Sequence, residues 1–273
     1  MPELPEVETL VRELRGALKG LRVRDVFVRN PLILGTPRPV FEKNLPGQSV
    51  REVRRIGKYI RVELAGNWVL WFHLGMTGRL FFAHPRARVP SHTHFALSFE
   101  NFPRPLFYRD IRRFGMIALT SRESEARPPG VSRLGPEPGD WDPEDFTSEF
   151  KARRARIKNL LLNQNLIAGL GNIYADESLH RAGIHPLKRA HRIPRKGLHR
   201  LHGAICEVLE EAVRWGGSSI DDYRRLDGSP GEFQKFHRVY GREGAECPAC
   251  SRPVRKIRLS GRSSSFCPQC QPS

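Results

Sequence analysis

The chain has 273 residues and carries 46 Lys and Arg against 29 Asp and Glu, which gives a formal net charge of +17 and a pI near 10.4. This cationic excess favours a nucleic-acid-binding protein, although a generally basic surface or contact with an anionic membrane would also explain it. No stretch is long and apolar enough to span a bilayer, and the N-terminus lacks a basic region followed by an apolar run. We therefore expect a soluble, intracellular, folded chain of roughly two or three domains.

The N-terminal residues read MPELPE and offer an unusual nucleophile. Removal of Met1 would leave Pro2 with a free secondary amine, which attacks an aldehyde-type carbon and forms an iminium ion. That cation is an electron sink and permits elimination chemistry on a sugar, with Glu3 adjacent for proton transfer. The structural alternative is that Pro2 and Pro5 simply begin a helix, because proline suits the first helical turn.

Apolar residues then recur at helical spacing and predict an amphipathic helix over residues 3–19, ended by Gly20. The Pro2 amine would lie at the helix N-terminus, where the helix dipole disfavours the protonated form. Glu3 and Glu6 would be favourable in that first turn whether or not they take part in catalysis.

From Leu21 to Leu119 the pattern changes to short β-type runs separated by Gly and Pro clusters, which predicts an antiparallel sandwich or barrel. The expected strands are Val23–Val28, Tyr59–Leu64, Trp68–His73, Arg79–Phe82, Phe95–Phe99, Leu106–Arg109 and Met116–Leu119. The polar, proline-bearing stretch 121–130 is typical of a linker.

Beyond the linker the apolar spacing is helical, and a polar, glycine-bearing loop follows Gly216 and Gly217. The expected helices are Glu144–Phe150, Ile157–Leu162, Ala175–Ala182 and Leu198–Trp215. Cys206, in the last of them, is interpreted as an inert core thiol. We expect a multidomain α+β chain: 1–130 for the helix and sandwich, 131–230 for the helical domain, and 231–273 for a metal-binding hairpin.

Four of the five cysteines form two C-x-x-C pairs, Cys247/Cys250 and Cys267/Cys270, with sixteen residues between the pairs. This spacing fits one structural zinc ion held by four thiolates. Two disulfides or a redox pair are the alternatives, and neither suits an intracellular chain without a βαβ context. The intervening Pro253–Leu259 and Ser263–Phe266 are predicted strands, with Gly261 at the turn.

Two further patterns indicate contact with a phosphate backbone. In GLGNIYADE, glycines precede Asn172, which is well placed to cap the next helix beside exposed amides. A dense basic run lies upstream and consists of Lys151, Arg153, Arg154, Arg156 and Lys158. The alternative is a capped core helix beside a solvated charged face, but the two features in one small region favour backbone binding.

Other candidates are ambiguous from the residues alone. Met76, in HLGMTG, and Phe114, in DIRRFG, would suit insertion into a base stack, but both are equally typical of a core. Lys58 precedes an apolar strand, and such a lysine is usually surface charge. His92 and His94 could be metal ligands, but no third ligand pattern supports this, which favours phosphate contact or strand-edge exposure.

Taken in chain order, these motifs resemble those of the formamidopyrimidine-DNA glycosylase family of bacterial base-excision repair enzymes. The resemblance covers the whole chain and rests on MPELPEVET, RRIGKYI, HLGMTG, RRFG, LGPEP, GLGNIYADE, VYGREG and the terminal C-x-x-C pairs. It implies an N-terminal β-sandwich with the first helix, a helix-two-turn-helix domain and a zinc finger with one structural Zn²⁺. It further implies a monomeric, cytoplasmic, nucleoid-associated enzyme that acts on double-stranded DNA containing oxidised bases or abasic sites.

The resemblance also implies residue roles. Pro2 would be the Schiff-base nucleophile on C1′, Glu3 the acid/base that assists opening of the deoxyribose, and Lys58 a supporting acid and phosphate contact. Arg262, on the hairpin turn, would grip a phosphate and assist the second elimination. The residues that would fill the duplex at the lesion are Met76, Arg112 and Phe114. The residues that would hold nearby phosphates are His92, Arg112, Arg154 and Asn172.

The implied activity is that of a bifunctional glycosylase/AP lyase for oxidised purines, chiefly 8-oxoguanine and formamidopyrimidines, with the loop from Gly217 to Phe233 closing over the flipped base. Two departures stand out: Ile111 replaces a proline frequent in the family, and Asp221 and Asp222 match no firm family pattern. The related oxidised-pyrimidine glycosylase typically has glycine at the position of Leu4, which disfavours it. The rival of a different class is a zinc-finger protein that binds damaged DNA without cutting it.

Overall fold

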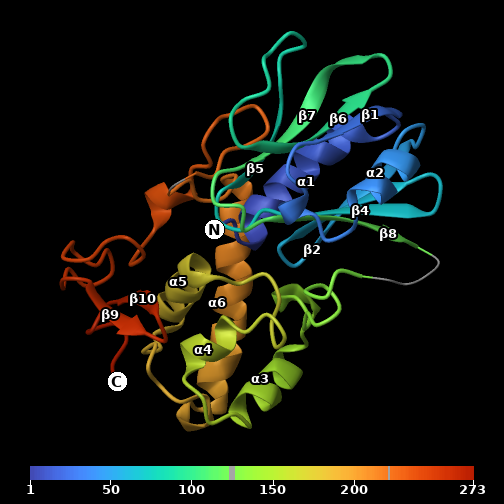
Figure 1. The fold of residues 1–273 in the computed structure, drawn as a ribbon. Coiled ribbons are helices and arrows are strands. Elements are labelled where there is room, and N and C mark those ends of the chain that lie inside the picture. The colour runs from blue at the N-terminus through green and yellow to red at the C-terminus, as the bar shows by residue number, and fades with distance from the viewer. Residues whose placement is uncertain (123–126, 221) are drawn as a thin grey trace. The chain divides into compact units, whose positions relative to one another are not determined.

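The computed structural model describes residues 1–122, 127–220 and 222–273, which form two compact units (Figure 1). The first unit combines Met1–Ser132 with Trp215–Glu232, and the second combines Arg133–Arg214 with Phe233–Ser273. The predicted linker includes positions 123–126, which lie outside the described residues. Across the described residues we find no helix with the length and apolar character needed to cross a membrane.

The first unit begins with α1 (Leu4–Leu18), in agreement with the predicted amphipathic helix. Pro5 lies in its first turn, where the missing N–H would have no helical partner in any case. Val7, Leu10 and Leu14 belong to a buried stripe that joins a core shared with two sheets. The N-terminus of the chain is thereby fixed to a packed scaffold.

Both sheets of the first unit are four-stranded and antiparallel, with strand orders β1-β6-β7-β5 and β2-β3-β4-β8. Their strands are β1 (Val23–Val28), β2 (Val50–Ile56), β3 (Tyr59–Leu64), β4 (Trp68–His73), β5 (Gly78–Phe82), β6 (Thr93–Phe99), β7 (Phe102–Asp110) and β8 (Met116–Ser121). The predicted antiparallel β-sandwich is confirmed, and β1, β3 and β4 match their predicted bounds. The unit also contains η1 (Pro31–Ile33).

Among the described residues of the first unit, β2, α2 (Arg38–Asn44) and the short η1 were not predicted. In β2 the apolar Val50, Val53 and Ile56 recur at every third position, which conceals the two-residue alternation of a strand. A register shift between Val50 and Glu52 accommodates that spacing in the ladder with β3. In α2 only Phe41 is buried, so the helix has no apolar stripe for a periodicity argument to find.

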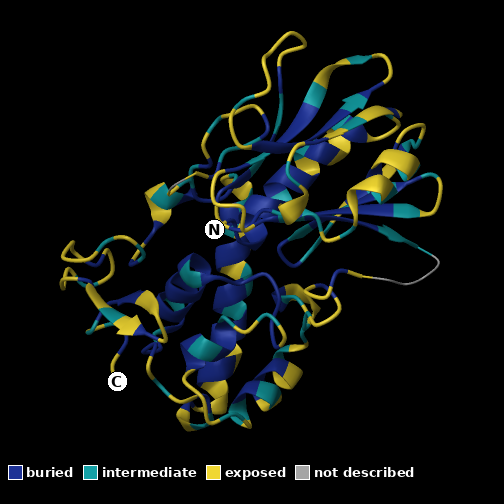
Figure 2. Ribbon diagram, viewed as in Figure 1, coloured by how far each residue is buried: buried dark blue, intermediate teal, exposed yellow. Residues whose placement is uncertain are grey.

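The second unit is helical and ends in a β-hairpin. Its helices are η2 (Pro138–Asp140), α3 (Pro143–Lys151), α4 (Ile157–Leu161), α5 (Asn172–Ala182), η3 (Ala190–Arg192), α6 (Arg195–Arg214) and η4 (Phe233–Phe236), and its hairpin strands are β9 (Arg255–Leu259) and β10 (Arg262–Phe266). The helical region and the hairpin are confirmed. Figure 2 shows α5 largely in the colour of buried residues, so this helix forms part of the unit's core.

The hairpin closes with a tight turn. Leu259 pairs with Arg262, so only Ser260 and Gly261 connect the strands. Both have positive φ, 48° and 78°, as a primed two-residue turn requires. The predicted turn at Gly261 is therefore confirmed, and it fixes the position of Arg262 at the start of β10.

Candidate active site

The start of α1 combines Pro2 with two buried carboxylates. Pro2 is buried, Glu3 is 2% exposed and Glu6 is 1% exposed. The backbone N–H of Glu3 donates to Glu6 Oε2 at 2.7 Å. Because Met1 is joined to Pro2 in this chain, the Pro2 nitrogen is an amide, and amine chemistry requires that Met1 be removed.

Glu6 also anchors the segment 215–232 of the same unit. The Ser218 N–H donates to Glu6 Oε1 at 2.7 Å, and the Tyr223 hydroxyl donates to the Glu6 carbonyl oxygen at 3.3 Å. Gly217 has a φ of +79°, and a Cβ there would lie 2.7 Å from Glu6 Oε1, so a larger residue does not fit. Sequence reasoning gave Glu6 only a helix-dipole role and missed this link. The available signal was its place at the fourth position of a capping box.

Lys58 lies in the turn between β2 and β3, beside Gly57, whose φ is +56°. Its side chain is only 6% exposed, so the interpretation as surface charge is wrong. Burial, and then the charge of Lys58, lower the pKa of His73 to about 4. The unprotonated Nδ1 of His73 can therefore accept the N–H of Gly75 at 3.2 Å near neutral pH.

An exposed apolar and cationic cluster is formed by two turns of the first unit. Met76, between β4 and β5, is 40% exposed, and Phe114, between β7 and β8, is 57% exposed. The alternative that both are core residues is therefore wrong. The Arg112 guanidinium carbon lies 4.7 Å from the centre of the Phe114 ring, a cation–π distance. Ile111 is also 45% exposed, consistent with a surface position.

Asp110 joins these two turns. Its carboxylate is fully buried and accepts from the Thr77 hydroxyl, from Arg112 N–H at 3.2 Å and from Gly115 N–H at 2.8 Å. The first donor belongs to the Met76 turn and the other two to the Phe114 turn. Sequence reasoning did not identify Asp110, although a single acid two residues before a pair of arginines was a visible signal.

The two histidines of HTH differ in environment. His92 is exposed with a φ of +61°, whereas His94 is 6% exposed and its Nε2 lies 2.8 Å from the Asp110 carbonyl oxygen. Among the described residues, the only grouping of three or more His, Cys, Asp or Glu side chains that could hold a metal is the four cysteines. The interpretation of His92 and His94 as metal ligands therefore gains no support.

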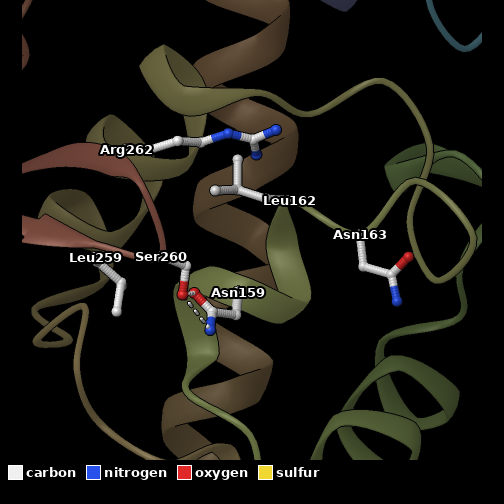
Figure 3. A pocket seen from close by; sticks show the side chains of 6 residues that line it. All are labelled: Asn159, Leu162, Asn163, Leu259, Ser260 and Arg262. Atoms are coloured by element: carbon white, nitrogen blue, oxygen red, sulfur yellow. Dashed lines mark hydrogen bonds between the residues drawn. The ribbon is translucent and has the colours of Figure 1, made fainter.

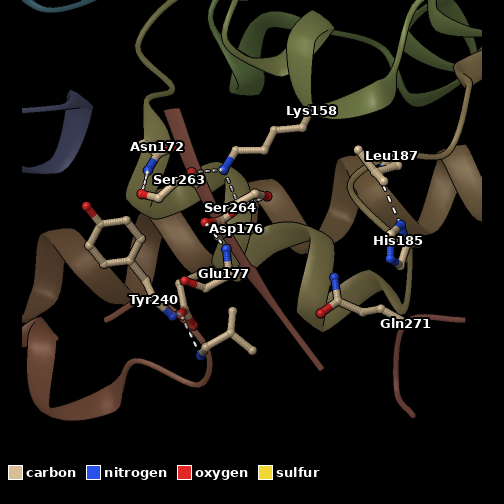
Figure 4. A network of polar contacts seen from close by, with 12 residues as sticks. Lys158, Asn172, Asp176, Glu177, His185, Leu187, Tyr240, Ser263, Ser264 and Gln271 are labelled. Atoms are coloured by element: carbon tan, nitrogen blue, oxygen red, sulfur yellow. Dashed lines mark hydrogen bonds and ion pairs between the residues drawn. The ribbon is translucent and has the colours of Figure 1, made fainter. Parts of the chain in front are cut away.

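In the second unit, Asn172 is the first residue of α5, and Gly171 occupies the capping position. The predicted asparagine cap is therefore wrong, because the extended Gly171 begins the helix without a side-chain cap. Asn172 Nδ2 instead lies 3.5 Å from Ser263 Oγ of the hairpin (Figure 4). The residue thus stands at the surface where α5 and β10 meet.

The basic run 151–158 is not a uniform charged face. Lys158 is 1% exposed, pairs with Asp176 Oδ1 at 2.6 Å and donates to the Ser263 carbonyl oxygen at 2.8 Å (Figure 4). Burial raises the pKa of Asp176 to about 6, although Lys158 opposes that shift. Arg154 and Arg156 remain exposed. The alternative of a solvated charged face is therefore wrong for Lys158.

Arg262 is exposed at the hairpin turn and borders a surface hollow of about 160 Å³. Figure 3 shows the residues that line it, Asn159, Leu162, Asn163, Leu259, Ser260 and Arg262. Asn159 Nδ2 donates to Ser260 Oγ at 3.1 Å, which joins α4 to the turn. A guanidinium beside amide groups in an open hollow can donate hydrogen bonds to an anionic oxygen.

The four cysteines are well arranged for one metal ion. Their sulfur atoms all lie within 4.8 Å of one another. The distances of 3.4 Å for Cys250–Cys267 and 3.8 Å for Cys247–Cys270 are close to the ~3.8 Å edge of a tetrahedron with zinc–sulfur bonds of ~2.3 Å. They are too long for disulfide bonds, so that alternative is wrong.

Comparison with known proteins covers almost the whole chain. Residues 1–117 match the formamidopyrimidine-DNA glycosylase N-terminal domain, residues 134–224 match the H2TH domain of the same enzymes, and residues 244–272 match the zinc finger found in FPG and IleRS. The formamidopyrimidine-DNA glycosylase of Solibacter usitatus is 46% identical over 272 residues, which cover 99% of each chain.

This chain belongs to the formamidopyrimidine-DNA glycosylase family. The resemblance inferred from the motifs is therefore confirmed, as are the fold class and the single structural zinc.

Two solved structures of family members extend the likeness to the fold. A Lactococcus lactis Fpg (MutM) complex with DNA containing N7-benzyl-Fapy-dG is 36% identical, has a TM-score of 0.93 and covers 100% of both chains. A complex of the Lactococcus lactis protein with DNA containing an abasic site is 36% identical, has a TM-score of 0.92 and covers 99% of this chain and 100% of the other.

Proposed function

We propose that this chain excises oxidised purines, 8-oxoguanine and formamidopyrimidines, from duplex DNA and then cleaves the resulting abasic site. It is a DNA glycosylase of base-excision repair. The observation that carries the finer proposal is the packed N-terminus, where Pro2 and the buried Glu3 begin a helix held in the core. A nucleophile on such a scaffold is positioned with little conformational freedom to lose.

After removal of Met1, the Pro2 amine attacks C1′ of the damaged nucleotide and forms a bond from nitrogen to carbon. Glu3 protonates the opening sugar, and the base leaves with its bonding electron pair and a proton. The iminium cation acidifies the C2′ protons. Loss of one proton expels the 3′ phosphate, and a second elimination, assisted by Arg262, expels the 5′ phosphate. Lys58 supplies a buried cation and acid.

We assign Met76, Arg112 and Phe114 to the space that the extruded nucleotide leaves. Their exposure supports this assignment, since unpacked apolar side chains on a folded surface are available for contact with bases. Asp110 holds the turns on which they stand. Unstacking a base costs on the order of a few kcal/mol, and filling the vacancy recovers part of that cost.

Phosphate contacts are assigned to His92, Arg112, Arg154, Asn172 and Arg262, each a polar or cationic side chain. The formal net charge of +17 supports a large sequence-independent contribution to binding. The loop 217–233 is assigned to the flipped base. Asp221, one of its candidate residues, lies outside the described residues. We further propose three domains, 1–130, 131–230 and 231–273, and a monomer in the bacterial cytoplasm beside the nucleoid.

Borohydride trapping tests the proposal. A mixture of 8-oxoguanine duplex, borohydride and protein of measured mass should yield a covalent complex when Met1 is absent. Adding one residue ahead of Pro2 makes its nitrogen an amide, and should abolish trapping and excision while duplex affinity changes little. Pro2→Gly keeps a primary amine and should retain part of the activity. Trapping by the extended protein would assign the nucleophile elsewhere, with Lys58 the next candidate.

The same assay separates the two rivals. A non-catalytic damage-binding protein would not trap on any duplex, even with a free Pro2 amine. An oxidised-pyrimidine enzyme would trap and excise faster on duplexes that contain an oxidised pyrimidine than on 8-oxoguanine. Leu4 favours the purine enzyme, so we expect the opposite order.

A further inference from the structure

Helix α5 presents one continuous face to the zinc hairpin. Asn172, Asp176 and His180 are spaced four residues apart and so lie on the same side of the helix. Each faces the zinc-binding region: Asn172 lies near Ser263 Oγ, and Asp176 accepts from Ser264 Oγ at 3.0 Å (Figure 4). The third member of this face reaches the metal ligands themselves.

His180 is 5% exposed, and its Nε2 lies 3.4 Å from the sulfur of Cys247. A zinc-bound cysteine is a thiolate, which can accept a hydrogen bond but has no proton to donate. The imidazole must therefore carry its proton on Nε2 and be the donor. Its Nδ1 is buried and has no hydrogen-bond partner among the described residues, which suits an unprotonated nitrogen.

The burial of the ligands explains why such a donor matters. Cys247 and Cys267 are 1% and 0% exposed, whereas Cys250 and Cys270 are partly exposed and open to water. Four thiolates around one Zn²⁺ carry a net charge of −2, and a buried thiolate needs a protein donor in place of water. Cys267 receives one from the Cys270 N–H at 3.4 Å.

We propose that His180 is a positioning residue of the zinc site, which donates a hydrogen bond from Nε2–H to the Cys247 thiolate and thereby slows loss of the metal. The hydrogen bond withdraws electron density from the sulfur and makes it less prone to protonation and displacement. It also ties zinc occupancy to the helix that begins at Asn172. Partners outside the first coordination shell typically change metal affinity about 10- to 100-fold.

The test uses the full-length, zinc-loaded chain and three variants. His180→Phe keeps a planar ring but removes the donor, and His180→Gln places an amide N–H near the former Nε2. His185→Phe is the matched control, because His185 is also buried and packs 4.5 Å from the Phe266 ring, while its Nδ1 accepts from Leu187 N–H. Zinc transfer to a chromophoric chelator is followed for each protein.

Zinc should leave His180→Phe about 10-fold faster or more, with His180→Gln intermediate and His185→Phe close to the unmodified chain. The same proteins loaded with Co²⁺ give an independent readout. Without the donor, the thiolate-to-cobalt charge-transfer band should shift to lower energy in His180→Phe and return toward the original position in His180→Gln.

Two results would overturn the proposal. One is an unchanged release rate and band position in His180→Phe. The other is equal acceleration in His180→Phe and His185→Phe without any band shift, which would assign the effect to general packing. Should His180→Phe fail to fold, His180→Asn, whose shorter amide does not reach the sulfur, replaces it in both measurements.

Discussion

His73 is a nearly buried imidazole at the end of the strand that leads into the Met76 turn. Its pKa is lowered to about 4 by burial and then by Lys58, against about 6.5 in an unfolded chain. Between these values the unfolded chain binds a proton that the folded chain does not. The contribution of the neutral His73 side chain to the free energy of unfolding is therefore fully present above pH 6.5. It is lost as the pH falls toward 4.

We expect His73→Asn to weaken this acid sensitivity, because its amide oxygen can accept from Gly75 N–H without titrating. The difference between the two proteins in the free energy of unfolding should change by up to about 3 kcal/mol between pH 7 and pH 4. Urea unfolding at several pH values measures it. Parallel pH profiles for the two proteins would show that His73 is readily protonated in the folded chain.

Asp110 is the residue whose loss should affect both exposed turns together. Asp110→Ala leaves the buried Gly115 N–H without its acceptor, which costs about 1–3 kcal/mol, and leaves the Arg112 N–H with Thr77 Oγ1 alone. Excision of 8-oxoguanine should slow more than cleavage of a pre-formed abasic site, where less stacking must be broken. Single-turnover rates on both duplexes test this expectation.

Asp25→Ala is the control for that experiment, since Asp25 is exposed and paired with Arg24 on the surface. It should leave both rates unchanged. Equal slowing of the two reactions by Asp110→Ala would mean that the turns serve DNA binding in general rather than base extrusion.

Helices α4 and α5 are joined by the Lys158–Asp176 ion pair, each side chain being 1% exposed. Lys158→Met leaves Asp176 buried without its cation and should destabilise the second unit by about 3–5 kcal/mol. Replacing both residues, Lys158→Met with Asp176→Leu, should recover part of that loss. Thermal unfolding of the zinc-loaded proteins measures both values.

Arg153→Met provides the surface comparison, because the Arg153–Glu149 pair is about 40% exposed on each side. Arg153→Met should lower the free energy of unfolding by no more than about 1 kcal/mol. If the two single variants were equally stable, the buried pair would have no structural role beyond that of a surface pair.

At the scale of helices and strands, the sequence predicts those features that a regular spacing of apolar residues or cysteines marks. The helix from Leu4 and the strands from Tyr59 and Trp68 follow from apolar periodicity, and the zinc ligands follow from cysteine spacing. Periodicity cannot reveal which single charges are buried, because that depends on partners distant in sequence. Lys158, whose partner Asp176 lies on another helix, illustrates the failure.

The candidate site shows the same division. Pro2 and Glu3 were proposed from their chemistry, and Asn172 and Arg154 from a local pattern of glycines and basic residues, whereas the role of Arg262 came from a family resemblance. Glu6, Asp110 and His180 were missed because each acts through hydrogen bonds to residues such as Ser218 or Cys247, and no local pattern encodes such partners.

The whole molecule consists of two units, and only one of them contains the metal ligands. Structural zinc supplies folding energy of about 10 kcal/mol or more in small zinc fingers. Chelation, or Cys250→Ser, should therefore lower the unfolding temperature of the second unit and abolish DNA binding while the sandwich stays folded. Calorimetry with and without chelator should show one transition that moves and one that does not. A single transition that shifts as a whole would contradict this.

The path of the chain between the units has a consequence for synthesis on the ribosome. The core of the first unit includes Tyr223 and Leu226, which emerge about ninety residues after Ser132. At the usual pace of about 5–20 residues per second, the sandwich must wait several seconds for its last core residues. Until then the nascent polypeptide exposes an incomplete apolar core. Chaperones that bind such surfaces have an interval in which to act before Pro2 and Glu6 reach their final environment.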